Sequence, residues 1–168
     1  DYLKNVAEKF DIKMKYSITD MNQPLGNQAG LICEVIESIE TLKGNGPNDL
    51  LKVVSHLANE CLTLAGIDNG IQKIEKVINN GKAYEKFEKM ITTQGGDISS
   101  IKLNPSITKV IKAEKEGYLN FNNTKGLGMS IIELGGGRKK IDDIQNIEII
   151  KSDLENDGKY FIEFVTAK

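Results

Sequence analysis

The chain has 168 residues, which is room for one domain or for a domain with a small appendage. Hydrophobic residues make up 39% and charged residues 27%, as in ordinary globular proteins, and no apolar run is long enough to span a membrane. The formal net charge of −2 excludes the broad basic surface that general nucleic-acid binding requires. The sequence does not open on the basic head and apolar run of a signal peptide, so we expect a cytoplasmic protein.

The beginning of the chain predicts a helix, a strand and a loop. Apolar residues at helical spacing predict the helix over residues 2–10. Four apolar residues then alternate with polar ones, which predicts a strand over Ile12–Ile18. The next residues, 19–27, include Pro24 and Gly26, which interrupt regular structure, so we predict a loop there.

The next part of the chain is predicted to be helical. Apolar residues recur at helical spacing, and turns rich in Gly, Asn or Pro separate one segment from the next. The predicted helices cover residues 29–43, 48–65, 71–78 and 82–92. Asn48 or Asp49 is expected to cap the second of them, because either side chain can accept the free amides of a first helical turn.

The pattern changes near Pro105, where strands replace helices. Alternating or β-branched runs predict four strands, and one helical segment separates the second strand from the third. The strands cover residues 107–113, 118–121, 147–150 and 160–165, and the helix covers 127–134. The predicted fold class is therefore α/β to α+β. Residues 1–104 form an incomplete α/β portion of one strand and about four helices, and residues 105–168 form a β-rich subdomain with one helix.

The residues that usually carry catalysis are scarce. Cys33 and Cys61 are far apart in the sequence and each belongs to a helical apolar pattern, so we expect buried free thiols. His56 is the only histidine and lies within a predicted helix, which favours a structural role at or near the surface. One histidine and two separated cysteines do not support a zinc site.

A run of three glycines, Gly135–Gly137, invites comparison with a phosphate-binding loop, and Arg138 follows it. Phosphate loops lead into the beginning of a helix, whereas this run follows the end of one and lacks the Lys-Ser/Thr pattern. We interpret it as a helix stop and a turn. Arg138 could reach an anion or could belong to a solvated charged surface.

Three glutamates, Glu34, Glu37 and Glu40, recur every third residue of the helix that follows the Gly26 loop. Such a row is usually a solvated helix face. Glu37 has a second interpretation, because its carboxylate and the carbonyls of the preceding loop could surround a hard cation. The residues alone leave both interpretations open and identify no active site.

The order and spacing of several short sequence stretches are informative when the stretches are taken together. They are Thr19–Gly26, Gly30, Glu34–Val35, Ile39–Gly44, Gly46–Pro47, Asp49–Leu50, Gly81–Ala83, Phe87, Met90, Gln94–Asp97, Gly117–Tyr118, Gly126–Met129 and Leu134–Arg138. In this order and spacing the sequence resembles the thymidine and pyrimidine-nucleoside phosphorylases over nearly its whole length, and in particular the C-terminal part of their large α/β lobe.

The resemblance implies a parent enzyme that cleaves pyrimidine nucleosides with phosphate, giving the base and a pentose 1-phosphate. Such enzymes close a cleft between a helical lobe and an α/β lobe, form homodimers and need no cofactor for the chemistry. Their phosphate loop, their Ser-Gly-Arg-Gly signature and their base-binding residues have no counterpart in this sequence. The resemblance thus implies a piece without catalytic or substrate-binding residues, inactive alone and completed by an N-terminal part. The alternative is a stand-alone binding or assembly module derived from that tail.

The resemblance also implies one structural ion, potassium, held by the carbonyls of Leu25 and Gln28 and by the Glu37 side chain. Gln28 replaces the small residue usual at its position, and Leu31 replaces an asparagine. Residues 151–159 also depart from the family pattern, since they lack its Gly-Asp pair and most of its basic character.

Overall fold

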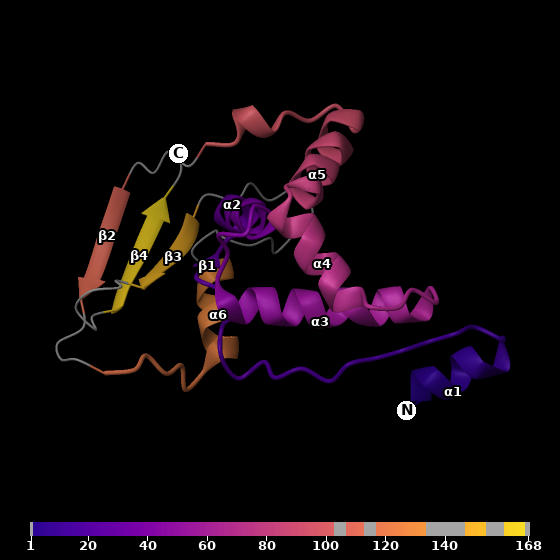
Figure 1. The fold of residues 1–168 in the computed structure, drawn as a ribbon. Coiled ribbons are helices and arrows are strands. Elements are labelled where there is room, and N and C mark those ends of the chain that lie inside the picture. Colours follow the sequence, from indigo (N-terminus) through magenta and orange to yellow (C-terminus); the bar gives the residue numbers. More distant parts are fainter. Residues whose placement is uncertain (1, 103–106, 113–116, 134–146, 154–159, 167–168) are drawn as a thin grey trace.

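The computed structural model of the chain describes residues 2–102, 107–112, 117–133, 147–153 and 160–166 (Figure 1). Helices dominate this described part, and four strands form one sheet. The helices are α1 (Tyr2–Lys9), α2 (Leu31–Leu42), α3 (Asn48–Leu64), α4 (Gly70–Asn79), α5 (Lys82–Thr93) and α6 (Thr124–Glu133), with a 3₁₀ turn, η1 (Ile98–Ser100). The strands are β1 (Gln28–Ala29), β2 (Ile107–Lys112), β3 (Ile147–Asp153) and β4 (Tyr160–Thr166).

The sheet is antiparallel throughout, in the order β1-β3-β4-β2. Strand β4 pairs along its whole length with β3 on one side and with β2 over six residues on the other. The short strand β1 extends the sheet at its edge, where Gln28 lies opposite Ile150. Figure 1 shows the sheet at one side of the molecule, with α2 and α6 next to β3 and with α3, α4 and α5 beyond them.

Helix α2 supplies most of the buried side chains in the described part. Cys33, Glu37 and Thr41 are each at most 8% exposed, and they recur every four residues, so they lie on one face of the helix. Ile39 is buried beside this row, at 7% exposure. A carboxylate therefore lies in the middle of the best-buried helix face of the described part.

The helical predictions are confirmed for α1, α3, α4 and α5, whose observed bounds lie within two residues of the predicted ones. Helix α2 begins later than predicted, because Gly30 adopts φ 137° and the two residues before it pair in β1. Helix α6 begins at Thr124, earlier than predicted, because the Asn123 side chain accepts the Gly126 amide at 2.8 Å. Pro47 occupies the N-cap position of α3 without a side-chain cap, so the predicted cap residue is wrong, although Asp49 Oδ1 accepts the first-turn amide of Leu50 at 2.9 Å.

The predicted strand over Ile12–Ile18 is wrong. These residues form no strand, and they run from α1 alongside α3 (Figure 1). Lys15 forms an ion pair with Glu60 at 2.8 Å, and the Ser17 hydroxyl lies 2.8 Å from His56 Nε2. A strand needs a neighbouring strand for its backbone, and no described strand pairs with this segment.

The predicted strand over residues 118–121 is also wrong. The side chain of Gln23 takes the place of a pairing strand, because its oxygen accepts the Phe121 amide at 2.9 Å and its nitrogen donates to the Phe121 carbonyl at 3.1 Å. The strands predicted at 107–113, 147–150 and 160–165 are confirmed as β2, β3 and β4.

The predicted fold class holds in its coarser form, a helix-rich first part followed by a β-rich part with one helix. The sheet includes β1 from the first part, so it joins the two portions. The predicted boundary at Pro105 falls outside the described residues, and the division into 1–104 and 105–168 stays a prediction. None of the described helices is long and apolar enough to cross a membrane.

Candidate functional site: the loop before helix α2

The loop that leads into α2 is surrounded by three carboxylates, and each accepts one of its backbone amides. The Asp49 carboxylate lies at the beginning of α3, and the other two lie on α2. The hydrogen bonds are Gly26 N–H to Asp49 Oδ2 at 3.0 Å, Asn27 N–H to Glu37 Oε1 at 2.7 Å, and Gly30 N–H to Glu34 Oε1 at 2.8 Å. The loop is thus fastened to both helices through its amides.

Gly26 makes this reversal of the chain possible. Its φ of +70° is in the left-handed region, where a residue with a Cβ is strained. It is also buried, and a Cβ built on it would overlap the Glu37 carboxylate, whose Cδ would lie 3.0 Å away. A glycine therefore fits the loop at the closest approach to α2.

Polar contacts with a segment distant in the sequence hold residues 22 and 23 of the same loop. Gln23 pairs with the backbone of Phe121, and the Thr124 hydroxyl donates to the Asn22 carbonyl. Because Thr124 begins α6, the loop is attached to that helix as well as to α2 and α3. These attachments fix the loop in place beside Glu37.

Glu37 has an unusual environment for a carboxylate, since it is only 8% exposed. Burial raises the pKa of its carboxyl group above the usual value, and the negative charges of Asp49 and Glu34 raise it further. The backbone amides of Asn27 and Gln28 oppose this rise in pKa, because they donate hydrogen bonds to the ionised form. Ionised Glu37 thus has hydrogen bonds but lies near two like charges.

In the described part of the chain, lysines form ion pairs with Glu8, Glu40 and Glu60, and none of these pairs offsets the negative charge of Glu37. The Oε1 atom of Gln28 is buried and has no hydrogen-bond partner among the described residues. A buried carboxylate and a free amide oxygen are the oxygen donors that hard cations prefer. The residues present therefore suit a hard cation, but the buried oxygen is the side-chain Oε1 of Gln28 and not the main-chain carbonyl that the resemblance implies. Among the described residues, no group of three His, Cys, Asp or Glu side chains forms a metal cluster.

The structure brings two of the three predicted site residues to the same loop-helix junction. Glu37 is buried against residues 26–28, so the solvated-face interpretation is wrong for this glutamate. Gln28 lies in β1, half-buried, and Leu25 is 45% exposed. Their roles as carbonyl ligands stay predictions.

The other two glutamates of the row are differently placed. Glu34 is exposed and accepts the Gly30 amide. Glu40 forms an ion pair with Lys43 at 3.1 Å, which holds the pKa of the Glu40 carboxyl below its usual value.

Sequence reasoning missed one member of the site, Asp49, which it treated only as a helix cap. The signal was available, since a second acidic residue follows the Gly46–Pro47 turn and belongs to one of the family-like stretches. Nothing in the spacing, however, shows that the beginning of α3 meets the loop before α2. The contact is a tertiary one, which the Gly26 amide of the loop makes with the Asp49 carboxylate in the first turn of α3.

The remaining candidates do not join this site. His56 is exposed on α3, as expected, and Cys33 is buried and forms no disulfide, also as expected. The prediction for Cys61 is wrong, because this free thiol is exposed. The glycine run and Arg138 lie outside the described residues.

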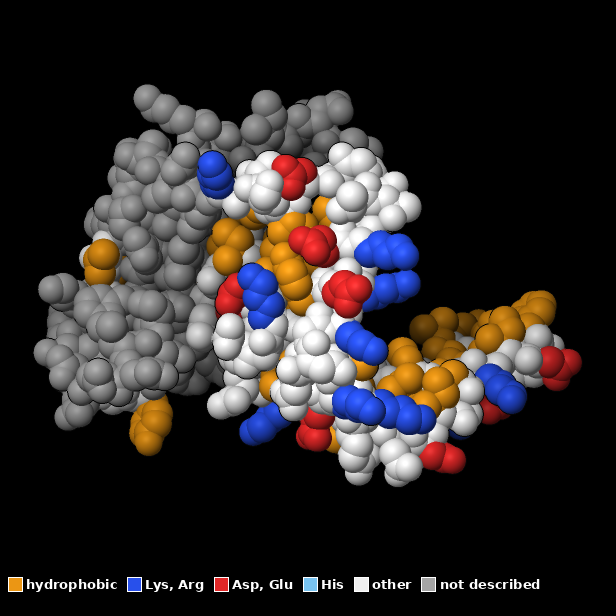
Figure 2. All heavy atoms as spheres, turned by 45° about the horizontal axis from the view of Figure 1, so that its top comes forward, with side chains coloured by type: hydrophobic (Ala, Val, Ile, Leu, Met, Phe, Trp, Pro, Cys, Tyr) orange, Lys and Arg blue, Asp and Glu red, His pale blue; other side chains and the backbone are white. Residues whose placement is uncertain are grey.

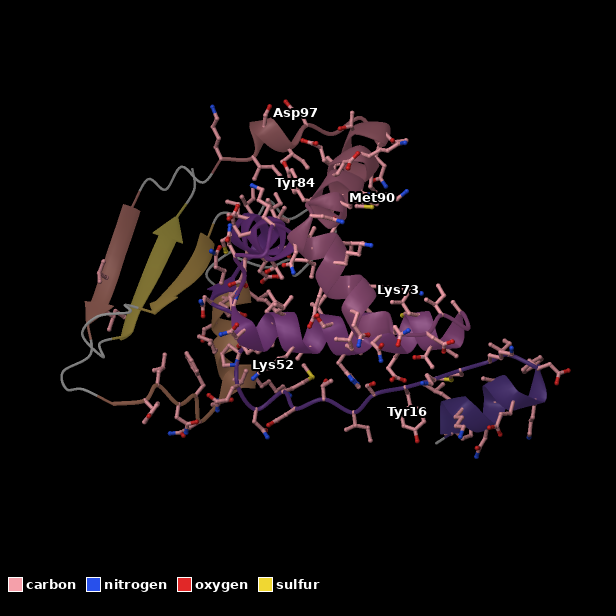
Figure 3. The ribbon with its side chains drawn as sticks, viewed as in Figure 1. Tyr16, Lys52, Lys73, Tyr84, Met90 and Asp97 are labelled. Carbon is pink, nitrogen blue, oxygen red and sulfur yellow. The ribbon has the colours of Figure 1, made fainter. Side chains whose placement is uncertain are left out.

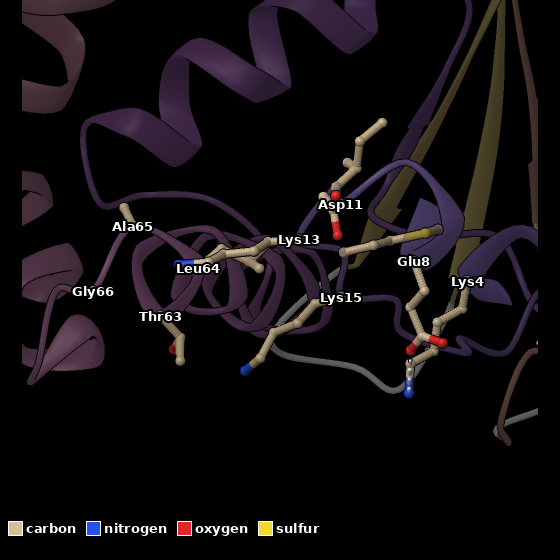
Figure 4. Close-up of a pocket in the computed structure, with 11 residues that line it drawn as sticks. Lys4, Glu8, Asp11, Lys13, Lys15, Thr63, Leu64, Ala65 and Gly66 are labelled. Atoms are coloured by element: carbon tan, nitrogen blue, oxygen red, sulfur yellow. Dashed lines mark ion pairs between the residues drawn. The ribbon is translucent and has the colours of Figure 1, made fainter. Parts of the chain in front are cut away.

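A cavity of about 710 Å³ lies elsewhere, between α1, residues 11–15 and the end of α3 (Figure 4). Its lining includes the ion pair of Lys4 with Glu8 and the side chains of Lys13 and Lys15. It shares no residue with the loop before α2.

Comparison with known proteins identifies what this chain is similar to. No protein-family model matches it. A thymidine phosphorylase of Metamycoplasma hominis is 35% identical over 147 residues, which are 82% of this chain and 54% of that protein. Pyrimidine-nucleoside phosphorylases of Staphylococcus epidermidis and Bacillus subtilis are each 37% identical, over 79% and 75% of this chain and 33% and 31% of their own lengths.

The chain is therefore homologous to the thymidine and pyrimidine-nucleoside phosphorylases, as its motifs indicated. It spans about half the length of the first of these relatives and about a third of the other two.

Proposed function

We propose that this chain forms the C-terminal part of a pyrimidine-nucleoside phosphorylase. In the complete enzyme, phosphate cleaves a pyrimidine nucleoside and releases the base and a pentose 1-phosphate. The observation that carries the proposal is the extent of the similarity, which reaches 82% of this chain at 35% identity. The proposal includes a homodimeric parent enzyme that acts in the cytoplasm. Neither Cys33 nor Cys61 forms a disulfide, which agrees with a reducing compartment.

In this proposal the chain supplies structure and not chemistry. We assign it no catalytic and no substrate-binding residue, because the phosphate loop, the Ser-Gly-Arg-Gly signature and the base-binding residues of the phosphorylases have no counterpart in this sequence. The groups that hold phosphate and pyrimidine belong to the part of the relatives that this chain does not cover. The chemistry would then depend on how that part docks and closes on this one.

We also propose that the loop before α2 holds a potassium ion, with the Glu37 carboxylate and the carbonyls of Leu25 and Gln28 as ligands. Two observations on the described residues support this proposal: none of their ion pairs offsets the charge of Glu37, and Gln28 Oε1 is buried without a hydrogen-bond partner among them. When bound, the ion would offset the repulsion between Glu37 and Asp49. It would thus favour the arrangement in which the loop lies against both helices.

Fragment complementation tests the main proposal. The 168-residue chain is mixed with the complementary part of the B. subtilis relative, and release of uracil or thymine is followed in the presence of nucleoside and phosphate. We expect no release by either part alone and phosphorolysis by the mixture. The matched segment of the relative itself, added in place of this chain, is the control.

Two outcomes separate the proposal from the alternative. If the relative's own segment restores activity and this chain does not, the chain is not a working phosphorylase part. If this chain binds the complementary part but the complex stays inactive, a stand-alone binding or assembly module is the better description.

A further inference from the structure

The segment Ile12–Ile18 lies on α3 with its polar side chains. Lys15 contacts Glu60, and Ser17 contacts His56. A step of two residues forward along the segment therefore corresponds to a step of four residues backward along α3. Two residues of extended chain advance about 6.6 Å and four helical residues advance about 6 Å, so these contacts fit an extended backbone running antiparallel to α3. The segment therefore has strand-like geometry without a strand partner.

The apolar side chains of the segment are exposed. In extended chain, alternate side chains point to opposite sides, so the residues between and beyond Lys15 and Ser17 face away from α3. Figure 3 shows the Tyr16 side chain on the side of the segment remote from α3. The exposed fractions are 59% for Ile12, 50% for Tyr16 and 92% for Ile18. The polar side of the segment contacts α3 and its apolar side is exposed, so the apolar side is open to a partner beyond the described residues.

The neighbouring helix extends this apolar surface. Tyr2, Leu3 and Phe10 are each at least 70% exposed, and Figure 2 shows hydrophobic side chains at the protruding end of the molecule formed by α1. Among the described residues, the backbone amides of Lys13 and Ser17 have no backbone acceptor. Both backbone groups and apolar side chains are thus available to a partner.

We propose that Ile12–Ile18 is a strand of a sheet that is completed by the part of the phosphorylase that this chain does not cover. This inference rests on the proposed function and names the surface through which the two parts meet. The relatives extend well beyond the matched region, since that region is 33% of the S. epidermidis protein and 31% of the B. subtilis protein. A strand from the remainder would pair with the backbone of this segment, including the amides of Lys13 and Ser17, and cover its outward apolar side.

A second copy of the chain fits this surface less well. Antiparallel self-pairing centred on the segment would place Lys15 opposite Lys15, and like charges directly opposite destabilise a strand pair. Lysine on an exposed edge is also a common device against self-association. The chain's own sheet lies at the opposite side of the molecule (Figure 1). The remainder of the enzyme is therefore the partner that this surface fits better.

The test uses the full chain, the complementary part of the B. subtilis relative and two matched variants. Ile18→Lys changes an outward side chain of the segment that is 92% exposed, and Ile71→Lys changes an exposed isoleucine of α4. Association is measured by light scattering after gel filtration, and amide exchange is followed over residues 12–18. We expect these amides to become protected in the mixture. We expect Ile18→Lys to weaken association at least tenfold and Ile71→Lys to leave it unchanged.

Three results would overturn the inference. In the first, an active complex forms while residues 12–18 stay unprotected, which leaves the proposed function standing. In the second, the chain alone dimerises with protection at these residues, which assigns the surface to a second copy. In the third, the two parts do not associate at all, which overturns the proposed function as well. Protection in an inactive complex would instead support the docking surface and count against the proposed function.

Discussion

The Glu37 carboxylate accepts the Asn27 amide at 2.7 Å, although Asn27 lies ten residues earlier and outside the helix. This bond fastens the loop before α2 to the buried face of that helix. It also keeps a carboxylate at 8% exposure beside two further acidic residues. The loop's stability should therefore depend on the space, the charge and the ions around Glu37, and each dependence can be measured.

The space around Glu37 is tested by replacing Gly26 with alanine. Gly26 and Gly66 have nearly the same φ, +70° and +74°, but a Cβ at Gly66 would meet nothing within 4 Å. Gly66→Ala should cost about 1 kcal/mol, the strain of a left-handed alanine. Gly26→Ala should cost about 2–4 kcal/mol, because the methyl group also displaces a buried hydrogen-bonded carboxylate. Urea unfolding measures both, and equal costs would show that the close approach of Gly26 to Glu37 does not matter.

The proposed ion is tested by thermal unfolding in potassium chloride and in tetramethylammonium chloride at equal ionic strength. Potassium should stabilise the chain, by about 1.4 kcal/mol at a tenfold excess over its dissociation constant. Glu37→Gln should abolish this difference between the salts. Glu40→Gln is the control, since Glu40 lies on the same helix but pairs with Lys43. A potassium effect that survives Glu37→Gln would place the ion elsewhere.

The charge on Glu37 should make stability depend on pH in an unusual direction. Its folded-state pKa is raised above the usual 4.5, so the folded chain holds the proton more tightly than the unfolded chain does. Binding of this proton therefore adds to the free energy of unfolding. The contribution is complete below pH 4.5 and is lost as the pH rises through the raised pKa. The lowered pKa values of Glu40, Glu60 and Asp97 act in the opposite direction.

The Glu37 contribution is therefore isolated as the difference between the wild-type chain and Glu37→Gln. The free energy of unfolding of both proteins is measured in urea, in tetramethylammonium buffers from pH 4 to 8. As the pH rises, the wild-type chain should lose stability relative to Glu37→Gln. Potassium should reduce the loss, because it favours the ionised carboxylate. A difference that does not change with pH would contradict the raised pKa.

The helices could be predicted from the sequence because their signals are local. Turn residues such as Gly66 and Gly81 end one helix or precede the next, and apolar residues at helical spacing define the segments between them. Strands are different, because their pattern says nothing about a partner. Ile12–Ile18 alternates as a strand should, yet no described strand lies beside it, and residues 118–121 bond to the side chain of Gln23 instead.

The candidate site was predicted only in part for a similar reason. Glu34, Glu37 and Glu40 look alike in a row of three-residue spacing, and this spacing cannot show which one is buried. The four-residue spacing of Cys33, Glu37 and Thr41 is the better signal, since it places Glu37 between two side chains suited to burial. The contribution of Asp49 depends on how α3 packs against the loop, which no local pattern specifies.

The contacts between the segment Ile12–Ile18 and α3 lead to the last prediction. Lys15 contacts Glu60 of that helix and Ser17 contacts His56. Replacing both by alanine should release the segment, so that its amides exchange several-fold faster in the isolated chain. The thermal midpoint should hardly change, because both links lie at the surface.

Strand β4 supplies the internal reference for this measurement, since it pairs with β2 and β3 and its amides should stay protected in both forms. Lys43→Ala, which removes a different surface ion pair, should leave exchange at residues 12–18 unaltered. If the double alanine variant exchanges as slowly as the wild-type chain, the segment is held by something other than its polar side. Its apolar side would then not be free to accept the strand of a partner.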